Sequence, residues 1–383
     1  MSQYFIKAKE FWLEEGVKQS GYLEVVDGLF GGYYSSTNET DLVWDMSDYI
    51  IAPGLFDTHI HGIKGYDVMD GTIKSIHVIS NVLAELGVTR FLPTTLTSSV
   101  RNIDQALRSV YGAIQEGVKG AKIEGIFLEG PYFTEVHKGA QNPKYFLDPK
   151  AEDFYRWQVL AGGNIKKIAL APEKKGSSEF IETIKKDNLT ISIAHTDASF
   201  EICKQAIDKG VSVFVHLFNG MRGLHHRDPG VVGAALRFHD TYSELICDGY
   251  HVNPDLVHIV NSIKGSHLVL VTDCMRAGLL SDGIYQLGEY NVTITNGKAE
   301  TEFGSLAGST LLLKDSVKNL SEWADISLYE AWHRASLSPA KSMNMDDRIG
   351  SIKRGKLADF VAIDKDLAIK RTFINGEPIY QKE

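Results

Sequence analysis

Short apolar runs recur along the middle of the chain, and most are followed by a stretch with helical spacing of apolar residues. Segments 73–87, 101–117, 200–210 and 253–265 have this helical spacing and end in glycine, which often terminates helices. Eight runs qualify as strands, namely "IIAPGLFDTH", "VTRFLPTT", "IEGIFLEG", "KIALAP", "LTISIAHT", "VSVFVHLF", "SELICDG" and "HLVLVTD". Eight strand-helix units predict a closed (β/α)8 TIM-like barrel over residues 52–344.

The two ends of the chain follow a different pattern, in which apolar and polar residues alternate over short stretches such as "YFIKAKEFW" and "RTFINGEPIY". This alternation predicts antiparallel strands, and Asn375-Gly376 is typical of a two-residue hairpin turn. We predict that residues 1–51 and 345–383 together form a small β-sandwich domain. Alternation within residues 281–309 predicts a further hairpin inserted in the last barrel loop.

Composition narrows the class of protein. The 383 residues are 43% hydrophobic and carry a net charge of −9, with no block of basic residues that would follow a nucleic-acid backbone. The three cysteines form no paired motif, which favours a reducing compartment. No signal peptide or run of about 18 apolar residues is present. We therefore expect a cytoplasmic protein that binds neither nucleic acid nor membranes.

Polar side chains stand at the C-terminal ends of several predicted strands. They are His59 and His61 after the first strand, Glu129 after the third, His195 after the fifth, His216 after the sixth and Asp273 after the eighth. In a barrel these strand ends form one rim, where barrel enzymes have their active sites. We therefore expect the six side chains to converge.

Imidazole and carboxylate groups gathered in this way predict a site for a divalent metal ion. Because four of the groups are histidines, zinc or iron is expected rather than magnesium or calcium. Residues two apart on a strand face the same way, so His59 and His61 can both point into the barrel mouth. Taken singly, each histidine is equally compatible with a hydrogen-bonded structural residue, and only their convergence distinguishes the two interpretations.

Several stretches give the chain a resemblance to a known family along almost its whole length. The chain resembles the amidohydrolase superfamily in "APGLFDTHIHG" and "GSIKRGKLADFVAID". It also resembles, more specifically, the superfamily's amino-sugar phosphate deacetylases in "HLFNGMRGLHHRDPGVVGAAL", "CDGYHVNP", "LVTDCM" and "GSLAGSTL". The resemblance implies hydrolysis of N-acetyl-D-glucosamine 6-phosphate to D-glucosamine 6-phosphate and acetate, within amino-sugar metabolism.

The resemblance also implies how the metal is held. Glu129, His195 and His216 are expected to bind one divalent ion, and His59 with His61 to bind a second one bridged by Glu129, so one or two ions per subunit are expected. Asp273 remains once these ligands are assigned. We predict that it acts as the general base, taking a proton from the attacking water and passing it to the departing nitrogen. The alternative role for Asp273 is a helix N-cap after the strand.

A phosphate group requires cations and backbone donors, and the chain has no glycine-rich nucleotide loop that would provide them. Asn219 and Gly220 are candidates for backbone amide donors, and Arg227 can present a forked guanidinium to phosphate oxygens. In the resembling enzymes, residues in the positions of Arg227 and His251 contact the phosphate, and one of them comes from a neighbouring subunit. The resemblance therefore implies a homodimer with the phosphate site near the subunit interface. The alternative interpretation of Arg227-Asp228 is a surface ion pair.

Two further stretches are expected to contact the substrate. Leu306, Ala307 and Gly308 align with a loop that touches substrate in the resembling enzymes, although its glycines also suit plain turns. Gln141 stands where several relatives have a histidine that contacts the acetyl carbonyl. Its amide can donate a hydrogen bond but carries no charge.

Other functions remain open at this stage. The galactosamine epimer differs from the glucosamine substrate only in the orientation of one hydroxyl group. No residue in the sequence decides between these two substrates. A cyclic-amide hydrolase is less compatible, because such relatives usually bridge their metals with a carboxylated lysine at the end of strand four, and "KIALAP" ends without one. A metal-binding barrel without catalysis is disfavoured by the presence of Asp273 beside a full ligand set.

Overall fold

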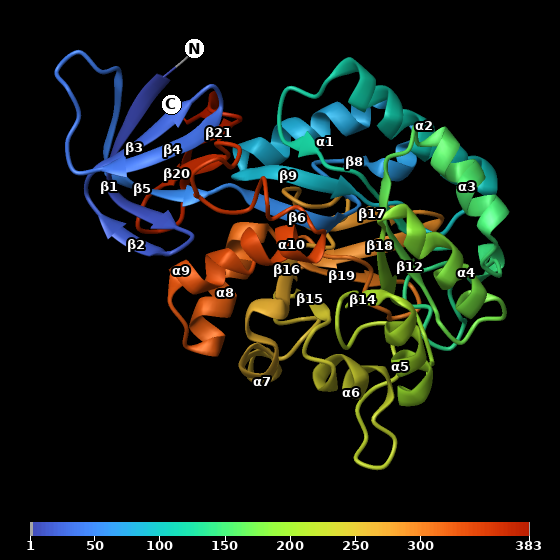
Figure 1. The fold of residues 1–383 in the computed structure, drawn as a ribbon. Coiled ribbons are helices and arrows are strands. Elements are labelled where there is room, and N and C mark those ends of the chain that lie inside the picture. The colour runs from blue at the N-terminus through green and yellow to red at the C-terminus, as the bar shows by residue number, and fades with distance from the viewer. Residues whose placement is uncertain (1–2, 383) are drawn as a thin grey trace.

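The computed structural model describes residues 3–382. Its centre is a ring of eight parallel strands, β6 (Leu55–Ile60), β9 (Val88–Pro93), β11 (Ile126–Glu129), β12 (Ile165–Leu170), β13 (Thr190–Ile193), β14 (Val211–Phe214), β15 (Tyr242–Ile246) and β16 (Leu268–Val271). Strands β11 to β16 pair in sequence and β6 pairs with β9. Bridges from Thr94 to Phe127 and from Ile60 to Cys274 close the ring. The predicted barrel is confirmed, and each strand overlaps one of the eight predicted runs (Figure 1).

Helices surround the barrel, as the spacing of apolar residues predicts (Figure 1). They are α1 (Ile73–Glu85), α2 (Val100–Glu116), α3 (Ala151–Leu160), α4 (Ser177–Ile184), α5 (Phe200–Lys209), α6 (Gly230–Arg237), α7 (Pro254–Lys264), α8 (Leu313–Ala324), α9 (Leu328–His333) and α10 (Leu337–Ser342). Side-chain oxygens of Thr72, Ser99, Ser199 and Asn253 accept hydrogen bonds from the first turns of α1, α2, α5 and α7, which fixes where these helices begin.

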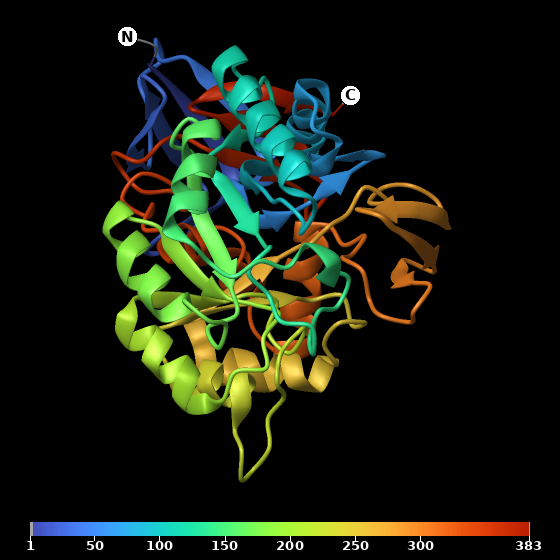
Figure 2. The ribbon, with the colours of Figure 1, turned by 90° about the vertical axis from the view of Figure 1, so that its right-hand side faces the viewer.

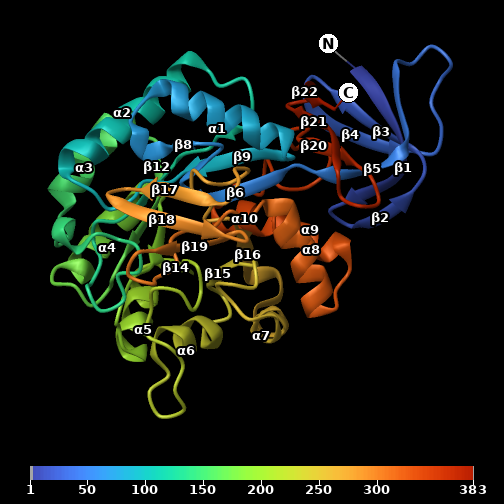
Figure 3. The same ribbon diagram turned by 180° about the vertical axis from the view of Figure 1, so that it is seen from behind.

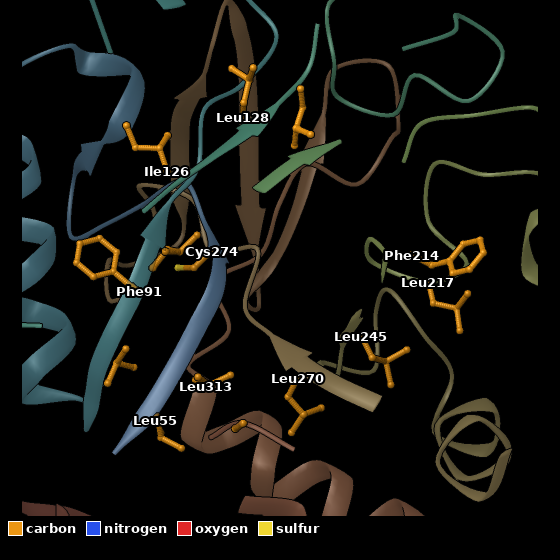
Figure 4. Close-up of a cluster of buried hydrophobic side chains, with 14 of the residues drawn as sticks. Leu55, Phe91, Ile126, Leu128, Phe214, Leu217, Leu245, Leu270, Cys274 and Leu313 are labelled. Carbon is orange, nitrogen blue, oxygen red and sulfur yellow. The ribbon is translucent and has the colours of Figure 1, made fainter. Parts of the chain in front are cut away.

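Two apolar layers hold the barrel together. The outer layer lies between strands and helices, where Leu55 and Leu270 from the strands pack near Leu313 from α8 (Figure 4). The inner layer fills the barrel itself and includes Phe56 and Phe127, both almost fully buried. Strand residues are therefore apolar on both faces, which explains why these strands appear as continuous apolar runs in the sequence.

Strands from both ends of the chain form one separate eight-stranded sheet, so the two termini share a domain of their own, as predicted. Its members are β1 (Gln3–Leu13), β2 (Gly16–Gln19), β3 (Tyr22–Val26), β4 (Leu29–Tyr34), β5 (Val43–Pro53), β20 (Phe360–Ile363), β21 (Ile369–Ile374) and β22 (Glu377–Gln381). The sheet has its own core and lies beside the barrel (Figure 3). One pairing differs from the antiparallel prediction, because β1 and β5 run parallel. The turn at Asn375-Gly376 joins β21 to β22 with positive φ at both residues, as predicted.

The predicted hairpin insertion is a three-stranded antiparallel sheet of β17 (Gly283–Leu287), β18 (Tyr290–Thr295) and β19 (Lys298–Thr301), which stands off one side of the barrel (Figure 2). The remaining short elements are β7 (Gly62–Ile63), β8 (Tyr66–Asp67), β10 (Lys122–Ile123) and the 3-10 helices Val68–Asp70, Pro143–Tyr145, Lys185–Asp187 and Gly265–His267. Within residues 3–382, no helix combines the length and apolar character needed to cross a membrane.

Candidate metal centre and active site

One cavity opens at the C-terminal ends of the barrel strands. Its lining comes from barrel strand ends, from the segment after β11 and from the segment after β19, and consists of His61, Leu96, Glu129, Gly139, Ala140, Gln141, His195, His216, Asn219, Gly220, His251, Asp273, Leu287, Ser305, Leu306 and Gly308. The expected convergence of the strand ends therefore occurs, with His59 fully buried just behind this surface.

Glu129 joins two groups of metal-ligating atoms. Its Oε1 lies 3.5 Å from His195 Nε2 and 3.3 Å from His216 Nε2, and its Oε2 lies 3.2 Å from His61 Nε2. His59 Nε2 is 3.6 Å from Oε1. The ligand atoms of Glu129, His195 and His216 lie within 4.8 Å of one another, as do those of His59, His61 and Glu129. Each group could hold a divalent ion, with Glu129 shared between them.

Asp273 lies on the side of the site occupied by the histidine pair. Its Oδ1 is 3.2 Å from His59 Nε2 and 3.1 Å from His61 Nε2. Among the described residues, neither this oxygen nor the Nε2 of His59 has a hydrogen-bond partner, although both atoms are buried. Buried polar atoms without partners are costly, so these atoms fit the requirements of metal ligands or of groups that contact a bound water.

Backbone carbonyls orient three of the four histidines. His61 Nδ1 is 3.2 Å from the carbonyl of Thr94, His195 Nδ1 is 3.2 Å from that of His137, and His216 Nδ1 is 3.0 Å from that of Asn219. A carbonyl only accepts, so in each ring Nδ1 carries the proton and Nε2 keeps its lone pair. The lone pairs therefore face Glu129, as metal ligation requires.

Close carboxylates and histidines shift the proton affinities of the site. Without a bound ion, burial acts to lower the pKa of His61, but Asp273 and Glu129 raise it to about 10, so Nε2 takes up a proton that a metal ion bound there would displace. Burial acts to raise the pKa of Asp273, but His59 and His61 hold it well below its usual range. Asp273 is therefore a carboxylate at neutral pH, the state in which it can accept a proton.

Three site residues adopt left-handed backbone conformations that side chains other than glycine rarely take. The φ angles are 45° at His195, 32° at His216 and 49° at Asp273. Each of them follows the last residue of its strand by two positions, so the chain turns sharply just where it presents the side chain. Such strain persists where the surrounding structure enforces it, and it is concentrated at functional sites.

Two glycines expected to contact substrate are required by the packing of the site. At Gly220, with φ of 60°, an added Cβ would lie 2.7 Å from His195 Nδ1. At Gly308, also with φ of 60°, it would lie 2.9 Å from the carbonyl oxygen of Asp273. Both residues line the cavity, so their backbones are also accessible to a ligand.

Most of the other residues predicted to contact the substrate lie at the cavity. Gln141, Asn219, His251 and Leu306 line the cavity. The backbone amide of Asn219 donates to the carbonyl of His216 and is thus already paired. His251 is held through its Nδ1, which is 2.7 Å from Asp248 Oδ2.

Two predicted contact residues lie outside the cavity. Ala307 is fully buried in the apolar cluster beneath the β17–β19 sheet. Arg227 is exposed on the loop that protrudes between β14 and α6, which is visible at the bottom of Figure 1. Within its own chain, Arg227 therefore does not line the site.

The sequence prediction missed a charged pair beneath the site. Lys167 on β12 and Glu244 on β15 are both 1% exposed and contact each other inside the barrel. The signal was a lysine and a glutamate inside otherwise apolar strand runs. Asp57, which belongs to the first motif, is also fully buried, and its Oδ2 accepts a hydrogen bond of 2.6 Å from Thr272, linking β6 to the segment after β16.

A barrel with this paired set of histidines and a shared carboxylate defines a class of metal-dependent hydrolases. Residues 50–379 match the amidohydrolase family model, and the chain belongs to the amidohydrolase family.

Named relatives and solved structures are similar to the chain along most of its length. It is 42% identical to the N-acetylglucosamine-6-phosphate deacetylase of Vibrio furnissii over 86% of this chain and 83% of that protein. It is 35% identical to the N-acetylgalactosamine-6-phosphate deacetylase of Escherichia coli O157:H7 over 98% of both chains. A solved mutant of the Mycobacterium smegmatis N-acetyl-D-glucosamine-6-phosphate deacetylase, in complex with N-acetyl-D-glucosamine-6-phosphate, is 25% identical with a TM-score of 0.92 and covers 100% of both chains.

Proposed function

We propose that this protein hydrolyses N-acetyl-D-glucosamine 6-phosphate to D-glucosamine 6-phosphate and acetate. The observation that carries the proposal is the position of Asp273, whose Oδ1 lies within 3.2 Å of two metal-ligating nitrogens at a cavity on the barrel rim. The similarity to deacetylases of this substrate over most of the chain supports the same reaction.

The residues fit a divalent ion bound by Glu129, His195 and His216, and a second bound by His59, His61 and Glu129. Nitrogen-rich ligand sets favour zinc or iron over magnesium. A bound divalent ion supplies Lewis acidity that polarises the amide carbonyl and makes water acidic enough to be deprotonated near neutral pH.

Asp273 then performs the proton transfers. As a buried carboxylate, it takes the proton from the attacking water and holds it at its side-chain oxygen until the tetrahedral intermediate collapses. The proton is delivered to the nitrogen of the leaving amine, so that D-glucosamine 6-phosphate departs and acetate remains.

Recognition of the phosphate is assigned to His251 and Arg227. His251 lines the cavity, and because its Nδ1 faces Asp248, its Nε2 is available to a ligand. Arg227 lies on the protruding loop, outside the cavity of its own chain. In a homodimer this loop would place Arg227 at the cavity of the neighbouring subunit, where its guanidinium can bind phosphate oxygens in a forked geometry.

Exposed apolar residues support a homodimer on this side of the molecule. Leu224 on the protruding loop is 62% exposed, and Leu256, Ile259 and Ile263 on α7 are 40%, 47% and 37% exposed. The three α7 residues are spaced three and four apart and so share one helix face. Apolar groups in such an arrangement are typical of a subunit interface.

A second candidate substrate is N-acetyl-D-galactosamine 6-phosphate, because a deacetylase named for that epimer matches 98% of the chain. The cyclic-amide alternative is disfavoured. The residue of strand β12 that pairs in register with Glu129 is Ala169, and not the lysine that such enzymes use to bridge their metals. The three cysteines are free and buried, in keeping with the cytoplasmic location that we also propose.

Acetate release measured on both phosphorylated epimers and on unphosphorylated N-acetylglucosamine tests the proposal. We expect the glucosamine phosphate to be hydrolysed fastest and the unphosphorylated sugar at least about 100-fold more slowly, since it lacks the charged group that His251 and Arg227 would bind. Equal turnover with and without phosphate, or none at all in the metal-loaded protein, would overturn the proposal. Faster turnover of the galactosamine phosphate would reassign the substrate.

A further inference from the structure

A lysine and a glutamate form an ion pair inside the barrel, directly beneath the histidine pair of the site. Lys167 Nζ contacts Glu244 Oε1 and lies 3.3 Å from the carbonyl oxygen of Thr58. The same Nζ lies 3.9 Å from the centre of the Phe127 ring. The mechanism assigns no step to either charged residue, although burying them is costly.

Glu244 divides its two oxygens between different partners. Oε1 forms the ion pair with Nζ of Lys167 and also accepts a hydrogen bond of 3.0 Å from the hydroxyl of Thr58. Oε2 lies 3.5 Å from Nδ1 of His59. Both Oε2 and this Nδ1 are buried and have no other hydrogen-bond partner among the described residues. Each is therefore the only available partner of the other.

His59 differs in this respect from the other three histidines of the site. His61, His195 and His216 face backbone carbonyls with Nδ1. Among the four candidate metal-ligating histidines, only His59 faces a carboxylate with Nδ1. A carboxylate behind a metal-ligating imidazole holds the proton on Nδ1, leaves the Nε2 lone pair free and raises the basicity of the ring.

We propose that Glu244, held in place by Lys167, is a positioning residue that sets the tautomer of His59 and thereby the affinity of the His59, His61 and Glu129 group for its divalent ion. Lys167 neutralises Glu244, so that a carboxylate can stand in the barrel interior. The inference deepens the proposed function and rests on its second metal ion.

Cobalt titration of the metal-free protein, followed by the d–d absorption of bound Co²⁺, measures the two equivalents separately. We expect two equivalents in the unchanged protein. In Glu244→Gln the amide oxygen can accept from Lys167, which turns the NH₂ toward His59 Nδ1 and favours the wrong tautomer. The equivalent assigned to His59 and His61 is then expected to bind about 10- to 100-fold more weakly, with the other unchanged.

Two further variants separate positioning from general stability. The double variant Lys167→Met, Glu244→Leu leaves no unpaired charge and is expected to fold, yet to show the same selective weakening of one equivalent. Ser243→Ala, on the same strand β15, is the matched control and should bind both equivalents normally.

The outcomes distinguish the inference from the proposed function. Unchanged binding of both equivalents in Glu244→Gln and in the double variant, or equal weakening of both, overturns the positioning role while the two-ion site stands. Binding of a single equivalent by the unchanged protein overturns the second ion, and the inference with it, but leaves one-metal hydrolysis intact.

Discussion

The side-chain amide of Gln141 is fixed between two groups that leave it one orientation. Its Oε1 accepts a hydrogen bond of 3.0 Å from the backbone amide of Thr97, and its Nε2 donates one of 3.0 Å to Oε2 of Glu129. The backbone amide can only donate, so the oxygen must face Thr97 and the NH₂ must face Glu129. Gln141 thus orients the carboxylate that the two candidate ligand groups share.

Replacing Gln141 with methionine, which has a similar volume, removes this donor. We expect kcat/KM for acetate release to fall roughly 10- to 100-fold, because supporting contacts behind metal ligands typically matter by that factor. Metal content of the purified variant should fall or become sensitive to weak chelators. Unchanged activity and metal retention would show that Glu129 needs no orienting donor.

Asp273→Asn removes the proton acceptor while keeping the shape of the side chain. We expect kcat to fall by about 10² to 10⁴, the usual contribution of a general acid-base group. The ion held by Glu129, His195 and His216 should remain, as measured by elemental analysis. Asp282→Asn, on the exposed hairpin, is the matched control and should be fully active. Activity surviving in Asp273→Asn would mean that another group is the base.

Mixing two variants, each impaired in a different way, at a substrate concentration below the raised KM tests whether Arg227 acts on the neighbouring subunit. Arg227→Ala should raise KM for the phosphorylated substrate, and Asp273→Asn should lose turnover. If Arg227 acts across the interface, reassembled heterodimers regain one complete site, so about a quarter of all sites in a random mixture become active. If it acts within its own chain, no mixture exceeds the activity of its components.

His59→Ala tests the number of metal ions. The group of Glu129, His195 and His216 is complete without His59. We expect the purified protein to contain two equivalents of metal and the variant one, by elemental analysis, with hydrolysis retained at a reduced rate. Equal metal content in both proteins would assign His59 a structural role.

The ionisation of Glu14, which lies outside the site, is expected to make the free energy of unfolding depend on pH. Burial acts to raise its pKa, but hydrogen bonds from Lys353, Lys356 and Ser351 lower it to about 2. A lowered folded-state pKa stabilises the fold above the unfolded value near 4.5, and this contribution is lost as the pH falls toward about 2. Urea unfolding at pH 7 should show Glu14→Gln less stable by about 1 to 2 kcal/mol, allowing for solvent screening. The difference should shrink steadily below pH 4.5, and a constant difference would contradict the assignment.

The sequence predicts the barrel and the convergence of the candidate metal ligands because both depend on local patterns. Each strand is an apolar run, and each ligand stands at the end of one, so strand order alone brings His59 and His216 together. Lys167 and Glu244 were missed because the pattern of apolar residues in a strand does not indicate which polar side chains point into the barrel. It also does not indicate that two of them, from different strands, meet there. The parallel pairing of β1 with β5 depends on long-range register in the same way.

The position of Arg227 shows a different limit. Its residue type is suited to phosphate, but Arg227 is exposed and does not line the cavity of its own chain. Whether such a residue completes a site depends on assembly, which the pattern within one chain does not encode. Ala307 differs again, since a small residue in a loop suits either close ligand approach or burial, and here the side chain is buried.

The pairing of β5 with β20 has a consequence for the order of events during synthesis. On the ribosome, β5 emerges roughly 300 residues before its partner, since Pro53 pairs with Phe360. The edge of β5 that will receive β20 therefore stays open while the entire barrel is translated. Completion of the terminal sheet is thus a late folding event, and a nascent chain stalled within the barrel would expose this edge to other chains.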